Sequence, residues 1–74
     1  MAMERGKELA EVLGVEPALA ERVLSFVSEH PGSKLTAIEE RMGISRIEAG
    51  RIIRDLMEQG KVRRDEVTRE YYPI

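Results

Sequence analysis

The sequence predicts a mainly α-helical domain with a small β-hairpin near its C-terminal end. Apolar residues recur with helical spacing as far as Leu56, a glycine follows each of three such stretches, and beyond Gly60 the pattern changes to the alternation of a strand. A chain of 74 residues buries only about 60% of its unfolded surface, so we expect one domain over residues 1–74 with one small core.

The first predicted helix covers residues 1–14. Its apolar residues Leu9, Val12 and Leu13 form one narrow stripe, and Gly14 stands where a helix commonly ends. The rest of the pattern is complete without this helix, which makes it an accessory element. Its stripe suits two roles, and both remain open at this point: a cover over the second helix, or a seam that joins two copies of the chain into a homodimer.

A second helix is predicted from Pro17 to about His30. Proline fits the first helical turn, where its missing N–H would have had no helical partner. A wide apolar face for the core is formed by Leu19, Val23, Leu24, Phe26 and Val27. Pro31-Gly32-Ser33 ends the helix, and Lys34-Leu35 is a candidate for a short edge strand.

A third helix is expected to begin at Thr36. Thr36 is the predicted N-cap, and Glu39, three residues further on, completes a capping box. The apolar residues of this stretch, Leu35, Ile38 and Met42, face one way. Gly43 is expected to end the helix, because glycine readily adopts the positive φ of a helix terminus.

A fourth helix is predicted over residues 45–59. Ser45 is its expected N-cap, Glu48 completes a second capping box, and Gly60 follows the helix. The residues expected to be buried share one stripe: Ala49, Ile52, Ile53 and Leu56.

Residues 61–74 are predicted to form the hairpin. Lys61-Val62-Arg63-Arg64 alternates as a half-buried strand does, and the polar residues 65–69 form the turn. The returning strand is expected in residues 70–74, where Pro73 is tolerated because it lies at the end of the strand.

Positive charge is concentrated in one segment of the chain. The net charge is −2 overall, but residues 45–64 carry +3, while residues 1–44 carry −3 and residues 65–74 carry −2. Two explanations remain open for this basic segment: a solvated helix face, or a surface that meets an acidic partner.

Several classes of function find no support in the sequence. The absence of cysteine excludes a zinc finger, an iron–sulfur site and a thiol nucleophile. The single histidine, His30, is expected at the end of a helix and not as a metal ligand. No glycine-rich phosphate loop and no hydroxyl–histidine–carboxylate set is present, so we expect no enzyme, no cofactor and no metal.

The composition also bears on localisation and stability. No apolar run approaches the ~20 residues of a membrane span, and residues 1–7 do not lead into the apolar core of a signal peptide. We therefore expect a cytoplasmic protein without a membrane partner. The chain has no Asn and one Gln, as in heat-adapted proteins, which suggests a thermostable protein; a GC-rich genome gives the same bias.

The most informative stretch runs from Leu35 to Arg64. A short helix, a Gly-hydrophobe-Ser turn and a longer capped helix make a helix–turn–helix. With the hairpin added, residues 18–74 resemble the winged helix–turn–helix family, especially small regulators of the MarR and ArsR type. The resemblance rests on Gly43-Ile44-Ser45-Arg46, on Arg51-Ile52-Ile53-Arg54-Asp55-Leu56 and on Gly60-Lys61-Val62-Arg63-Arg64.

The resemblance implies sequence-selective binding of double-stranded DNA in transcriptional control. Helix 45–59 would be the recognition helix in the major groove, and hairpin 61–74 would be the wing. The residues that would contact DNA are Thr36, Ser45, Arg46, Ile47, Gly50, Arg51, Arg54, Lys61, Arg63 and Arg64. Arg46 and Arg51 are the expected base readers, because arginine matches guanine O6 and N7 bidentately. Thr36 and Ser45 would meet phosphates at helix N-termini.

Each of these assignments has a structural alternative. Thr36 and Ser45 serve equally well as caps alone, Gly50 as a packing contact, and Arg54 as the i, i+4 partner of Glu58. Ile47 on an outer helix face suits a thymine methyl group or a protein interface.

The sequence departs from the family pattern at the wing. Its tip carries Asp65, Glu66 and Glu70 against Arg69 alone, so insertion of the tip next to phosphates is doubtful. The Gly-Lys-Val opening of the wing is shared with Z-DNA-binding winged helices, but their recognition helix needs an Asn and a Tyr where this chain has Gly50 and Arg54. The acidic balance keeps a second function open: a winged helix that serves as a protein–protein interaction module in a larger complex.

Overall fold

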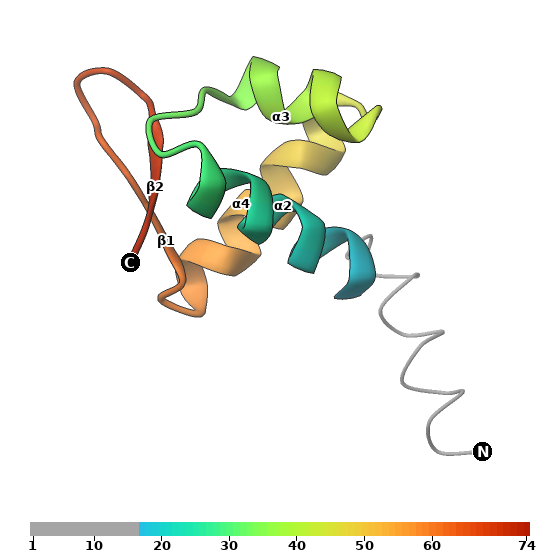
Figure 1. Cartoon of the computed structure of the whole chain (residues 1–74), viewed down its shortest axis with the longest axis horizontal. Coiled ribbons are helices and arrows are strands. Elements are labelled where there is room, and N and C mark those ends of the chain that lie inside the picture. Colours follow the sequence, from blue (N-terminus) through green and yellow to red (C-terminus); the bar gives the residue numbers. More distant parts are fainter. Residues whose placement is uncertain (1–16) are drawn as a thin grey trace.

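The computed structural model describes residues 17–74, which form three helices and one two-stranded antiparallel hairpin (Figure 1). The elements are α2 (Pro17–Glu29), α3 (Leu35–Met42), α4 (Arg46–Glu58), β1 (Val62–Arg64) and β2 (Tyr71–Pro73). The predicted fold class, mainly helical with a small β-hairpin, is confirmed. The accessory helix predicted over residues 1–14 lies outside the described residues.

Helix α2 begins at Pro17, as the sequence predicts, and ends one residue before His30. Its core face consists of Ala20, Val23 and Val27, which are buried, while Leu19, Leu24 and Phe26 pack against the core from its edge. The turn that follows the helix is stabilised by Ser33, whose hydroxyl donates to the carbonyl oxygen of His30.

The connection between α2 and α3 corrects two predictions. Thr36 is not the N-cap of α3; that position belongs to Lys34, whose side chain makes no capping hydrogen bond. The edge strand expected at Lys34-Leu35 is also wrong, because Leu35 already belongs to the helix and the strand-like bridge falls on Ser33 instead, opposite Tyr71. Tyr71 donates its N–H to the Ser33 carbonyl (2.8 Å) and accepts from the Gly32 N–H (2.8 Å).

This bridge explains the earlier helix start. Because Ser33 is paired with β2, the chain is extended there, and Lys34 keeps the same extended backbone with φ −93° and ψ 162°. The Lys34 carbonyl then accepts from the N–H groups of Ala37 (3.1 Å) and Ile38 (3.3 Å), which starts the helix at Leu35.

The turn between α3 and α4 follows the sequence prediction. Gly43 adopts φ 66°, a left-handed conformation, and both its N–H and that of Ile44 point back to the carbonyl of Glu39. Ser45 then caps α4, since its hydroxyl oxygen accepts from the N–H of Glu48 at 3.2 Å.

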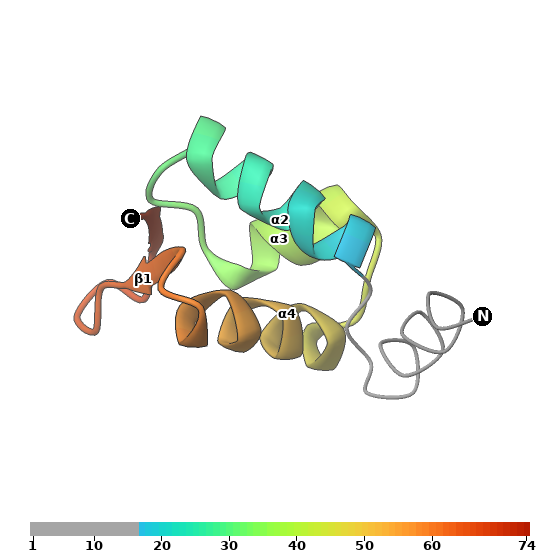
Figure 2. The same cartoon turned by 90° about the horizontal axis from the view of Figure 1, so that it is seen from below.

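The core lies between the three helices and the hairpin. The stripe predicted on α4, namely Ala49, Ile52, Ile53 and Leu56, is buried. It meets Val23 and Val27 of α2, Ile38 of α3, and Val62 and Tyr71 of the hairpin in one cluster. Figure 2 shows α4 on one side of the domain with α2 and α3 on the other, so these two helices leave the outer face of α4 uncovered.

The hairpin pairs Val62 with Pro73, Arg63 with Tyr72 and Arg64 with Tyr71. Gly60, with φ 73°, turns the chain from α4 into β1. None of the helices within residues 17–74 is long and apolar enough to cross a membrane. The same part of the chain holds no group of three or more His, Cys, Asp or Glu side chains placed to bind a metal ion.

Candidate nucleic-acid interface

The outer face of α4 is the first part of the candidate interface. Ile47, Arg51 and Arg54 are exposed and follow one another at helical spacing, opposite the buried stripe. Ile47 is 69% exposed, which is unusual for a large apolar side chain. The capping turn at Ser45 fixes where this face begins.

The structure bears on the alternatives for Arg54 and Gly50. Arg54 does pair with Glu58, at 3.6 Å, but both side chains are exposed (84% and 68%), so this pair leaves Arg54 available to a partner. Apart from the adjacent residues and the nearby backbone of α4 itself, a Cβ added at Gly50 would meet no atom of the described residues within 4 Å. Close packing against a neighbouring helix therefore does not explain the glycine.

A cleft of about 400 Å³ forms the second part of the interface, between the hairpin loop and the beginnings of α3 and α4. It brings together three of the predicted residues, Thr36, Arg46 and Arg64. Three polar residues that the sequence did not single out join them: Lys34, Thr68 and Arg69. Leu35 and Tyr71 complete the lining.

The two arginines of β1 point to opposite faces of the hairpin, because side chains alternate along a strand. Arg64 shares its face with the buried Val62 and lines the cleft. The guanidinium of Arg63 instead lies over the ring of Tyr72, 4.6 Å from its centroid. Lys61 is exposed just before the strand. The basic residues of β1 thus lie on two different faces of the hairpin, with Arg64 on the cleft face and Arg63 on the opposite one.

Tyr72 is held on the face of Arg63 by further contacts. Its hydroxyl donates to a Glu70 carboxylate oxygen at 3.2 Å, and the hydrogen bond to Glu70 raises the pKa of Tyr72. The ring lies against Gly32, where an added Cβ would stand 3.5 Å from the Tyr72 hydroxyl oxygen. Arg63 is therefore supported by an ordered aromatic ring.

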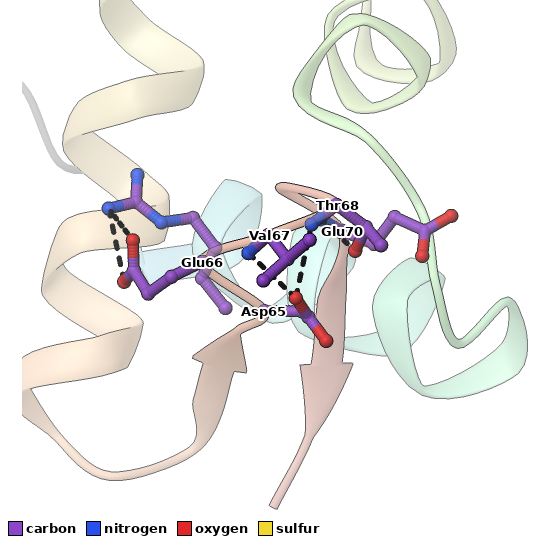
Figure 3. A network of polar contacts seen from close by, with 6 residues as sticks. Asp65, Glu66, Val67, Thr68 and Glu70 are labelled. Carbon is purple, nitrogen blue, oxygen red and sulfur yellow. Dashed lines mark hydrogen bonds and ion pairs between the residues drawn. The ribbon is translucent and has the colours of Figure 1, made fainter.

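The acidic residues at the wing tip make contacts within the wing (Figure 3). Oδ1 of Asp65 accepts from the N–H groups of Val67 (2.8 Å) and Thr68 (3.1 Å), which lowers the pKa of Asp65. Both carboxylate oxygens of Glu66 contact Nη2 of Arg64, at 3.1 and 3.3 Å. A side-chain hydrogen bond with Tyr71 and, after it, the negative charge of Glu66 raise the pKa of Arg64. The charge of Glu66 is thus paired within the wing, while Asp65 keeps its negative charge.

Three polar residues of the cleft were not predicted as site residues, and the path of the chain explains why. Lys34 was assigned to an edge strand, but it is the N-cap of α3 and lines the cleft. Arg69 and Thr68 belong to the loop, whose return is set by Arg69 at φ 61°. The positive charges of Lys34 and Arg69 were the only sequence signal for this site, but nothing in the sequence indicated that the two residues lie close together.

Known structures resemble this arrangement of three helices and a hairpin. The ORF112 Zalpha domain of cyprinid herpesvirus 3, a structure concerned with its binding to Z-DNA, matches with a TM-score of 0.75 and 22% identity over 81% of this chain and 98% of that one. The chain has the winged-helix fold. The tip residues Asp65 to Glu70 thus belong to the wing of this fold, and α4 is the helix that precedes the wing.

A second winged-helix structure is more similar in sequence. An IclR transcriptional regulator from Alicyclobacillus acidocaldarius matches with a TM-score of 0.71 and 38% identity over 76% of this chain. The match spans 23% of the regulator's own length. Both structures support the resemblance to winged-helix DNA-binding proteins, and neither singles out the MarR or ArsR type. No protein-family model matches the sequence, and no curated protein does.

Proposed function

We propose that the chain binds double-stranded DNA with sequence selectivity and acts in transcriptional control, with α4 in the major groove. The observation that carries this proposal is the outer face of α4, where Ile47, Arg51 and Arg54 are exposed on a side that α2 and α3 leave uncovered. A helix is about 10–12 Å wide and the major groove about 12 Å, so the two fit.

The residues of this surface divide into readers and backbone contacts. Arg51 reads guanine through paired hydrogen bonds, while Ile47 contacts a thymine methyl group. Arg46, which the sequence suggested as a second base reader, lines the cleft beside the wing and contacts a phosphate there. The empty space beside Gly50 lets a base edge or a sugar come close to the helix. Arg54, Lys61 and Arg63 contact phosphates, which position the domain without reading sequence.

The two structural neighbours support a nucleic-acid partner. One is described with Z-DNA and the other is a transcriptional regulator. Neither neighbour is an enzyme by its description, which agrees with a binding function, and we propose that this chain has no catalytic role. The match spans under a quarter of the regulator, so this comparison supports no proposal about an effector response.

The direct test is a fluorescence titration of the full chain against duplex DNA at two salt concentrations. We expect binding to random-sequence duplex that weakens steeply with salt, as phosphate contacts require, and tighter binding to sequences enriched by selection. A duplex that forms Z-DNA is the matched comparison and is expected to bind no better. Absence of binding to every duplex at low salt would overturn the proposal.

The second candidate function is a protein–protein interaction module. It is favoured by two exposed apolar side chains, Ile47 on α4 and Val67 at the wing tip, the latter 92% exposed. The same titration separates the two functions, because a protein adaptor would show no salt-dependent binding to duplex DNA. Ile47→Asp would then abolish partner binding without any effect on DNA.

We further propose that the chain forms a homodimer through residues 1–14. A dimer would place two recognition helices about 34 Å apart, one turn of DNA, and would bind a palindromic site. Sedimentation velocity of the full chain and of a chain without residues 1–14 is the test. A full chain that is monomeric at tens of micromolar would contradict the dimer and leave a cover over α2 as the role of the segment.

A further inference from the structure

The cleft between the wing loop and the beginnings of α3 and α4 gathers positive charge from four separate segments. Lys34 precedes α3, Arg46 begins α4, Arg64 lies in β1 and Arg69 in the wing loop, and all four side chains line the same cleft of about 400 Å³. Such a cluster is unfavourable in isolation, since like charges repel. A bound anion would remove that repulsion.

Few carboxylates of the described residues balance these charges. Glu66 pairs with Arg64, but Lys34, Arg46 and Arg69 make no ion pair within residues 17–74. The Nε of Arg64 is buried and finds no hydrogen-bond acceptor there. The lining thus contains more donors than acceptors, which is the composition of a site for an oxyanion.

The wall formed by α3 adds donors of a second kind. The first N–H groups of a helix have no partner inside the helix, and Lys34 supplies no side-chain cap at this end. The hydroxyl of Thr36 lies in the first helical turn, on the lining of the cleft. Helix N-termini favour anions, so the backbone and the four cations favour the same ligand.

We propose that this cleft binds one phosphate group of the DNA backbone, and that Glu66 occupies Arg64 until the phosphate replaces it. The inference rests on the proposed function and adds to it a contact that lies away from the outer face of α4. Guanidinium groups bind carboxylate and phosphate in a similar geometry, so a phosphate can take the place of Glu66 on Arg64. The contact fixes the wing on the DNA and reads no base.

Two substitutions in the cleft and one outside it test the proposal. Lys34→Gln and Arg69→Asn each remove one charge, and asparagine tolerates the positive φ at position 69. Each is expected to weaken binding about two- to fivefold for all sequences and to reduce the slope of log K against log salt by about 0.9. Arg22→Gln, an equal loss of charge at an exposed position of α2, is the control and is expected to leave the affinity and the salt slope nearly unchanged.

A change in the opposite direction is expected at the competing carboxylate. Glu66→Gln should strengthen DNA binding about two- to fivefold, because Arg64 no longer has to leave an ion pair. Glu21→Gln, at an exposed position of α2, is the matched control for the loss of one negative charge, and a smaller gain in DNA affinity is expected for it. Circular dichroism melts establish that all variants are folded.

The outcomes separate this proposal from the proposed function. If the full chain binds duplex DNA but the cleft variants match their controls, the phosphate site is overturned and DNA binding stands. If the full chain binds no duplex, DNA is ruled out as the source of the phosphate. A titration with inorganic phosphate, followed by NMR, then shows whether the cleft binds free phosphate, through chemical-shift changes of the amides at residues 34–36 and 64–69. No shifts in that titration would overturn the anion site altogether.

Discussion

The outer face of α4 and the wing loop both carry charged side chains, but they use them differently. On α4, Arg51 makes no ion pair within residues 17–74, and Arg54 has only the exposed partner Glu58. In the loop, Asp65 binds backbone N–H groups and Glu66 binds Arg64. Charged residues thus stay exposed in one region and make contacts within the fold in the other. Net charge alone does not distinguish these uses.

The largest effect on stability is expected in the core that holds the outer face of α4 in place. Leu56→Ala should destabilise the domain by about 2–5 kcal/mol, because Leu56 is 2% exposed and its loss leaves a cavity. Ile47→Ala on the opposite face is the control and should be close to neutral. Thermal and urea unfolding measure both. A Leu56→Ala variant that melts within a degree or two of the wild type would show that burial of α4 is not what holds its outer face in place.

The second prediction separates reading from positioning. Arg51→Ala should cost about 1–3 kcal/mol of binding and relax selectivity at one base, as expected for an arginine that reads guanine. Arg63→Ala should weaken all sequences evenly and flatten the salt slope by about one unit. Competition titrations with selected and random duplexes measure the difference. Equal behaviour of the two variants would remove the distinction between α4 and the wing.

Gly50 tests whether the open space on α4 serves DNA. Gly50→Ala should stabilise the domain by about 0.5–1 kcal/mol, because alanine fits there and favours the helix. The same change should weaken DNA binding if a base edge or sugar approaches this position. A variant that is stabilised and binds DNA unchanged would show that the glycine has no role in the interface.

A smaller, pH-dependent effect is expected in the wing loop. The pKa of Asp65 is lowered in the folded state by its hydrogen bonds to Thr68 and Val67. Its contribution to stability is therefore present above the unfolded pKa of about 3.9 and disappears as the pH falls through the lower, folded value. Asp65→Ala should melt below the wild type at neutral pH, and the difference should close under acid. A difference independent of pH would exclude the ionised carboxylate as its cause.

The smallest effect is expected at the exposed pair on α4. Arg54→Gln should change stability by at most about 0.5 kcal/mol, because exposed i, i+4 pairs contribute little. If Arg54 contacts a phosphate, the same variant should still flatten the salt slope of DNA binding. A loss of stability well above that limit would show that Arg54 stabilises the fold, as Asp65 and Glu66 do in the wing loop.

Local chemistry was enough to predict α2, α4, the turn before α4 and the hairpin, and distant contacts account for the wrong start of α3 and the wrong edge strand. The Ser45 cap, the left-handed Gly43 and the buried stripe of α4 depend on neighbours within a few residues, and all were predicted. The start of α3 depends on Ser33 pairing with Tyr71, a contact that no local pattern contains. The cation cleft has the same origin, because it needs Lys34 placed by that pairing and Arg69 placed by the loop.

The bridge between Ser33 and β2 has a consequence for the thermodynamics of binding. A two-stranded hairpin is marginally stable by itself, and one joined to the domain only through Gly60 would sample many orientations. Here the hairpin is also tied to the α2–α3 connection by two backbone hydrogen bonds of 2.8 Å, and Tyr71 is buried in the core. The orientation of the wing relative to α4 is therefore set before any ligand arrives. If the wing contacts DNA as proposed, association loses little conformational entropy in the wing, and more of the contact energy appears as affinity.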